Sequence, residues 1–178
     1  MANCITILRI LLILPILTLI SPDQSFNNWA ALVIFVIASV SDHLDGYVAR
    51  KTQTVSNLGA LLDLLADKLL ICIVLSYVIS ITGELFLTIP ALIIISREII
   101  ISSLRQYVSE KEGNNPIAVN FFAKIKTTLQ MIAVSFLIIS PNFESSFFFI
   151  TLILIWISAY ISIHSLFLYL KTYKNFLK

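Results

Sequence analysis

Charged and polar residues are scarce in this sequence. Only 12% of the 178 residues are charged and 58% are hydrophobic, whereas a soluble domain usually carries about 25% charged residues. So few polar groups could not cover a water-soluble globule of this size. Because no polar stretch is long enough for a separate soluble domain, we expect one domain, residues 1–178, made of membrane helices.

The sequence also contains few cysteines and carries little net charge. Cys4 and Cys72 are the only cysteines, and both lie in apolar sequence that is typical of helices. We therefore expect core packing for both and no disulfide. The formal net charge is only +2, which is too small a surplus to indicate a nucleic-acid partner.

Apolar stretches separated by proline, glycine and polar residues predict six helices. Several of these stretches approach the roughly 20 residues that a helix needs to cross a bilayer. The expected helices are residues 5–20, 28–50, 58–81, 85–109, 117–140 and 146–171. The expected fold class is an all-α integral membrane protein with six transmembrane helices.

Basic residues are missing from every second loop. The loops 21–27, 82–84 and 141–145 contain acidic residues but no lysine or arginine, and all twelve basic residues lie near the opposite helix ends. By the positive-inside rule, those ends and both termini face the cytoplasm. We expect a multi-pass protein of the cell inner (cytoplasmic) membrane.

Four aspartates interrupt the apolar sequence of the second and third expected helices. Asp42 and Asp45 are three residues apart, and Asp63 and Asp67 are four apart, so each pair lies on one face of its helix. A short loop makes the two helices antiparallel neighbours, so the four carboxylates can converge. Small residues on the same faces leave space for a ligand: Gly46, Ala49 and Gly59.

Such a cluster is costly inside a membrane. Each aspartate costs roughly 2.5–3.5 kcal/mol on insertion scales, and like charges repel one another. Only Arg50 and Lys68 are close in sequence, which is too little positive charge to neutralise four carboxylates. Two divalent cations that prefer oxygen ligands, Mg²⁺ or Mn²⁺, would balance the site. Paired metal ions are a common device for displacement at phosphorus, so a substrate with a lipid tail and a diphosphate head would suit a site that opens to the cytoplasm.

The aspartates belong to a longer pattern of fixed residues, Asp42-x2-Asp45-Gly46-x2-Ala49-Arg50-x8-Gly59-x3-Asp63-x3-Asp67. This pattern resembles the full signature of the CDP-alcohol phosphatidyltransferase family, with every position filled. The six-helix layout is similar to that family as well. The resemblance implies a membrane enzyme that transfers a phosphatidyl group from CDP-diacylglycerol to an alcohol, and it implies a homodimer.

The resemblance also implies roles for individual residues. Asp42 and Asp63 would bind both metal ions, whereas Asp45 and Asp67 would complete one each. Asp67 would also accept the proton of the attacking hydroxyl, as the catalytic base. The residues expected to hold CDP-diacylglycerol are Gly46, Ala49, Arg50, Ser56 and Gly59.

Three further segments narrow the acceptor alcohol. Residues 3–15, 97–105 and 124–131 are similar to bacterial members of the family that use sn-glycerol 3-phosphate, which would make the products phosphatidylglycerophosphate and CMP. The basic residues at the cytoplasmic ends of the fourth and fifth helices agree with an anionic acceptor, because they could bind a phosphate monoester. The candidates are Arg97, Arg105, Lys124 and Lys126.

Two alternatives remain open from the sequence. Another acceptor within the same family, such as inositol phosphate, serine or phosphatidylglycerol, would use the same aspartates. A divalent-metal transporter would also place aspartates inside a membrane, but it would not explain Arg50 beside the pathway or the glycines that leave space for a bulky head group.

Overall fold

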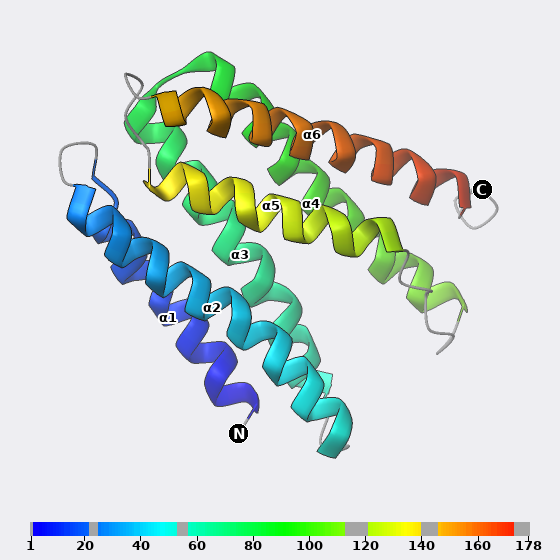
Figure 1. Cartoon of the computed structure of the whole chain (residues 1–178). Coiled ribbons are helices and arrows are strands. Elements are labelled where there is room, and N and C mark those ends of the chain that lie inside the picture. The colour runs from blue at the N-terminus through cyan, green and yellow to red at the C-terminus, as the bar shows by residue number, and fades with distance from the viewer. Residues whose placement is uncertain (1, 22–24, 53–56, 113–120, 140–145, 173–178) are drawn as a thin grey trace.

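The computed structural model describes residues 2–21, 25–52, 57–112, 121–139 and 146–172, all but a few of them helical (Figure 1). Each of the six predicted helices is present. The helices are α1 (Ala2–Leu19), α2 (Ser25–Thr52), α3 (Asn57–Thr82), α4 (Leu85–Glu112), α5 (Phe121–Ile139) and α6 (Ser146–Thr172). The protein is therefore all-α, as the sequence predicts.

Short connections link α1 to α2 and α3 to α4, and the helices of each pair pack against each other. Gly83 ends α3 with a positive φ of 68°, a conformation that glycine adopts without steric cost, and its N–H donates to the carbonyl of Ile79 at 2.9 Å. The carbonyl of Glu84 then accepts bonds from the N–H and the hydroxyl of Thr88, at 2.9 and 2.7 Å. Two residues are thus enough to turn the chain from α3 into α4.

The connection between α1 and α2 is held by one buried amide. Asn28, 2% exposed, accepts a bond from the Ser21 N–H and donates one to the Ser21 carbonyl, both at 2.8 Å. These two bonds give hydrogen-bond partners to main-chain groups between the helices that would otherwise lack them. They fix where α2 begins relative to the end of α1.

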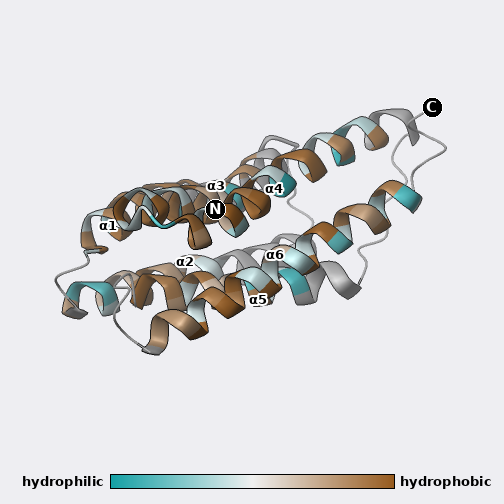
Figure 2. Ribbon diagram, turned by 90° about the horizontal axis from the view of Figure 1, so that it is seen from above, coloured by the Kyte–Doolittle hydropathy of each residue, from teal (hydrophilic) through white to brown (hydrophobic). Residues whose placement is uncertain are grey.

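The helices form two layers, seen edge-on in Figure 2. One layer contains α1, α3 and α4, and the other contains α2, α5 and α6. Within the layers, α3 packs against α1 and α4, and α5 packs against α2 and α6; between the layers, α1 packs against α2, α4 against α6, and α3 against α5. The core between them is apolar, with fully buried side chains such as Ile16, Phe35, Val74, Leu137 and Ile155.

Large apolar side chains also cover the outside of the bundle. Phe149, Ile153, Tyr160 and Phe167 of α6 are all at least 60% exposed, and soluble monomers rarely expose such contiguous apolar surface. Among the residues that the structure describes, two stretches are long and apolar enough to cross a membrane, Leu85–Val108 with 24 residues and Phe147–Thr172 with 26. Both features are typical of helices that face lipid.

Candidate active site

The four aspartates lie on two helices that touch each other. Asp42 and Asp45 are in the C-terminal half of α2, and Asp63 and Asp67 are in the N-terminal half of α3. Because both stretches are helical, the spacings of three and four residues put each pair on one face of its helix. The side chains of all four are outside what the structure describes, so their convergence stays a prediction.

The other residues predicted around the aspartates fall on the same two helices or next to them. Their side chains, like that of Lys124, are outside the described part of the structure, and Ser56 is outside it altogether. Those with a helical backbone are Gly46, Ala49 and Arg50 in α2, Gly59 in α3, and Lys124 in α5.

A buried cluster of charges joins side chains of α4 and α5. Arg97 of α4 is 6% exposed, and Lys126 of α5 is 1% exposed. Both pair with the same atom, Oε1 of Glu98: Arg97 Nη1 lies 3.3 Å from it, and Lys126 Nζ contacts it as well. One carboxylate therefore pairs with two cations inside the bundle.

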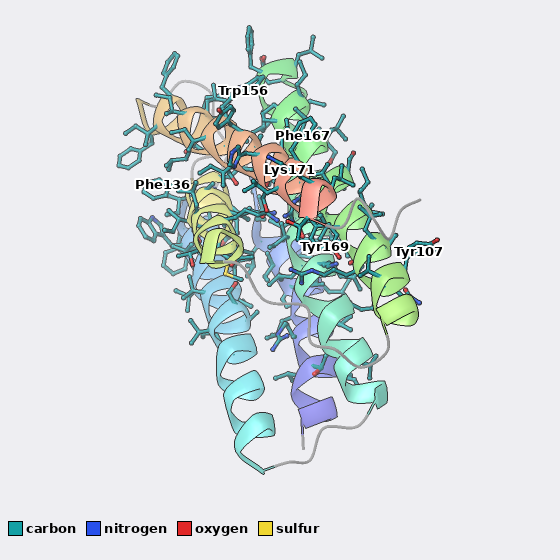
Figure 3. The ribbon with its side chains drawn as sticks, turned by 90° about the vertical axis from the view of Figure 1, so that its right-hand side faces the viewer. Tyr107, Phe136, Trp156, Phe167, Tyr169 and Lys171 are labelled. Atoms are coloured by element: carbon teal, nitrogen blue, oxygen red, sulfur yellow. The ribbon has the colours of Figure 1, made fainter. Side chains whose placement is uncertain are left out.

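Arg97 also fastens α6 to α4. Its Nε donates to the Ser162 carbonyl at 3.3 Å, and its Nη2 donates to the Ser165 hydroxyl at 2.8 Å. Together with the bond to Glu98, three of the five N–H groups of this guanidinium have protein partners. Nearer the start of both helices, Trp156 (labelled in Figure 3) donates its Nε1 to the Phe86 carbonyl at 3.1 Å.

The charge cluster is tied to the helix that carries Asp63 and Asp67. Lys68, the residue after Asp67, donates its Nζ to the main-chain carbonyl of Glu98 at 3.5 Å. This contact brings α3 against α4 at the level of Arg97 and Glu98. The charge cluster and the aspartate-bearing stretch of α3 therefore lie next to each other.

Arg105 has a shielded donor that a ligand could use. It lies about 12 Å further along α4 than Arg97, at 1.5 Å per residue, and it is half-buried. Its Nε is shielded from solvent and has no hydrogen-bond partner within the described ranges. Buried donors are nearly always paired in native proteins, so this N–H indicates a place where a ligand or water binds.

Comparison with known proteins identifies the family of this chain. The sequence model of the CDP-alcohol phosphatidyltransferases matches residues 1–164. The chain belongs to the CDP-alcohol phosphatidyltransferase family. It is therefore a transferase.

Curated relatives within this family are similar along most of their length. A CDP-diacylglycerol–glycerol-3-phosphate 3-phosphatidyltransferase from Haemophilus influenzae is 37% identical over 172 residues, which is 96% of this chain and 91% of the relative. The protein of the same name from Escherichia coli K12 is 36% identical over 138 residues, 78% of this chain and 76% of the relative. A third, from Wigglesworthia glossinidia brevipalpis, is 36% identical over 132 residues.

Sequence reasoning missed three polar residues around the charge cluster of this phosphatidyltransferase. Ser162 and Ser165 hold Arg97, and Gln130 lies one turn beyond Lys126 on the same face of α5. Neither Oε1 nor Nε2 of Gln130 has a hydrogen-bond partner in the described portion of the chain, although the side chain is 0% exposed. Spacing offered a signal: Ser158, Ser162 and Ser165 form a polar stripe along an otherwise apolar α6.

Proposed function

We propose that this chain transfers the phosphatidyl group of CDP-diacylglycerol to sn-glycerol 3-phosphate, giving phosphatidylglycerophosphate and CMP. The relatives named for this activity are covered over most of their length, 91% in the first case. The observation that carries the proposal is the contact between Lys68 and Glu98. It puts the buried charge cluster of Arg97, Glu98 and Lys126 beside the helix of Asp63 and Asp67, where an anionic acceptor would have to bind.

The aspartates suit divalent metal by their chemistry. Carboxylate oxygens are the ligands that Mg²⁺ and Mn²⁺ prefer, and the family is generally metal-dependent. Asp42, Asp45, Asp63 and Asp67 would hold two such ions between the touching helices α2 and α3. When bound, the ions would neutralise the diphosphate of the substrate and stabilise the leaving oxygen.

The protein residues would then bind and orient the substrates, and one of them would accept a proton. Gly46, Ala49 and Gly59 leave room for the CDP head group, and Arg50 and Ser56 hold it, because a guanidinium matches phosphate oxygens in geometry. Asp67 accepts the proton of the acceptor hydroxyl as its oxygen attacks the lipid-side phosphorus. CMP leaves from the same phosphorus.

This chemistry needs no covalent intermediate. Cys72 lies on α3 beyond Asp67, and the aspartates are committed to metal, so direct displacement follows. Both substrates must be bound together, which makes the kinetics sequential, and the configuration at phosphorus should invert. A phosphatidyl-enzyme trapped without acceptor, or retention of configuration, would contradict single displacement.

The acceptor phosphate would bind among Arg97, Arg105, Lys124 and Lys126. Arg105 contributes a donor that has no hydrogen-bond partner among the described residues, and Lys126 and Arg97 contribute positive charge. Glu98 keeps these two cations in place before the acceptor arrives. A charge-assisted bond of this kind is about twice as strong as a neutral one, which favours a phosphate monoester over an uncharged alcohol.

The proposed setting is the cell inner (cytoplasmic) membrane. Residues 1–178 form a single domain whose six helices cross the bilayer, with both termini and the active site facing the cytoplasm. Membrane lipids surround the apolar outer face, and two copies associate as a homodimer. The absence of basic residues from alternate loops supports the orientation.

One assay tests this function. Purified protein is incubated with CDP-diacylglycerol, Mg²⁺ or Mn²⁺, and a panel of acceptors (glycerol 3-phosphate, inositol phosphate, serine and phosphatidylglycerol) while CMP release is followed. We expect release with glycerol 3-phosphate and metal, and none after chelation. Release with another acceptor alone would refute the acceptor assignment, and metal uptake by proteoliposomes without CMP release would refute the enzyme.

A further inference from the structure

Arg9 is a full positive charge inside the bundle. It is the only charged residue of α1, and it is 1% exposed. Thr6, one turn earlier on the same face, is 3% exposed, so this face of α1 points into the protein. An arginine stays protonated in proteins, and a buried charge is retained only where opposite charge compensates it.

The packing of α1 restricts where that compensation comes from. Among the described helices, α1 packs against α2 and α3 alone. The carboxylates on α2 are Asp42 and Asp45, and those on α3 are Asp63 and Asp67. Hydroxyls and carbonyls can bind a guanidinium, but only a carboxylate neutralises it.

The remaining acidic residues are badly placed for Arg9. Asp23 and the exposed Glu84 follow the other ends of α1 and α3, and the end of α1 is about 15 Å from Arg9 at 1.5 Å per residue. Glu98 pairs with Arg97 and Lys126 on helices that α1 does not contact. Glu110 and Glu112 are at the end of α4, and Glu144 precedes α6.

We propose that Arg9 is the resident counter-ion of the four aspartates and positions them for metal. The inference rests on the proposed metal site. Without metal, Arg9 reduces the repulsion among the carboxylates. With two divalent ions bound, four positive charges balance four negative ones, and Arg9 adds one more, which favours the anionic diphosphate of the substrate. Arg9 is a positioning residue, since it acts through the aspartates.

The direction in which metal affinity changes when Arg9 is removed distinguishes this role from ordinary packing. A cation near the carboxylates opposes the binding of other cations, so its removal should tighten metal binding. The same removal should destabilise the metal-free protein, because four carboxylates lose their compensating charge. A residue that only fills space would give neither the tighter binding nor a metal-dependent loss.

The test uses the full chain in detergent, with Arg9→Met to remove the charge and Arg9→Lys to keep it. Mn²⁺ binding is measured by electron paramagnetic resonance, and the thermal midpoint is measured with and without Mn²⁺. For Arg9→Met we expect about tenfold tighter Mn²⁺ binding, a lower midpoint without metal, and a larger rise on adding Mn²⁺ than in the unaltered protein. Arg9→Lys should stay near the unaltered protein.

Lys171→Met is the matched control, because it removes one positive charge from an exposed site on α6. It should change neither measurement. Unchanged or weaker Mn²⁺ binding by Arg9→Met, with the same loss of midpoint with and without metal, would overturn the proposal.

A second variant keeps the proposal testable if Arg9→Met does not fold. Combining Arg9→Met with a change of one of the four aspartates to asparagine should restore the metal-free fold. If none of the four double variants folds, Arg9 is not the counter-ion of the aspartates. This pairing needs no metal. If the unaltered protein itself does not bind Mn²⁺, the proposed metal site fails, and the paired variants still decide the role of Arg9.

Discussion

The two halves of this protein handle buried charge in opposite ways. In α4, α5 and α6, cations and a carboxylate are mixed: Glu98 lies between Arg97 and Lys126, and the protein itself supplies nearly all of the balance. In α2 and α3, four carboxylates of like charge share two touching helices. We propose that the first arrangement binds an anion and that the second holds divalent metal ions.

The contrast predicts its largest effect at the catalytic base. Asp67→Asn should lower turnover by about 10²–10⁴-fold, the usual effect of losing general-base catalysis, and lost metal ligation would add to it. CDP-diacylglycerol binding should be largely kept, since Asp42, Asp45 and Asp63 remain. Turnover is measured by CMP release, with Asp23→Asn as the control outside the signature. Near-normal turnover would remove Asp67 from the role of base.

The next effect concerns the carboxylate of the basic half. Glu98→Gln leaves Arg97 and Lys126 buried without their counter-ion, and breaking a buried pair costs about 3–5 kcal/mol of unfolding free energy. The thermal midpoint should fall and should recover partly in inorganic phosphate, because an anion can replace the lost charge. Glu84→Gln, at an exposed site, is the control. Recovery in chloride to the same extent would argue against a phosphate site.

A smaller and more selective effect is expected at the acceptor pocket. Arg105→Ala should raise the KM for glycerol 3-phosphate about tenfold or more, because a hydrogen bond to a charged group contributes about 1.5–3 kcal/mol. The KM for CDP-diacylglycerol should change less. Arg97→Ala should raise the same KM but also lower the thermal midpoint, since Arg97 holds α6. Equal changes in both KM values would move Arg105 to the nucleotide site.

The smallest effect tests the link to α6. Ser165→Ala removes one hydrogen bond to Arg97 and should cost about 1 kcal/mol of stability, with a small rise in the KM for glycerol 3-phosphate as the guanidinium loses its support. Ser103→Ala is a close control, because that hydroxyl bonds only the Ile99 carbonyl of its own helix at 3.2 Å. If both variants behave alike, Ser165 has no part in orienting Arg97.

The sequence predicted the helices well because the signals for them are local. Proline, glycine and polar residues mark the breaks, and the helix expected at 28–50 is found at Ser25–Thr52. The aspartate faces could be predicted for the same reason, since three- and four-residue spacings act within one helix.

The contacts between helices could not be predicted in this way. Arg97 bonds Ser162 and Ser165, 65 and 68 residues further along the chain, and no periodicity in the sequence brings them together. Arg97 is one of the four basic residues that we expect around the acceptor phosphate, and two of its donors bond α6. Arg105, with a buried Nε that has no protein partner in the described region, is the stronger candidate.

The bond between Lys68 and residue 98 has a consequence for redesign. Its acceptor is a main-chain carbonyl, which every amino acid supplies, so the side chain at position 98 can be exchanged without removing the acceptor that holds α3 to α4. The two halves of the enzyme can therefore change separately. Acceptor preference could be altered through positions 97, 98 and 126 while the register of the aspartate helix is preserved.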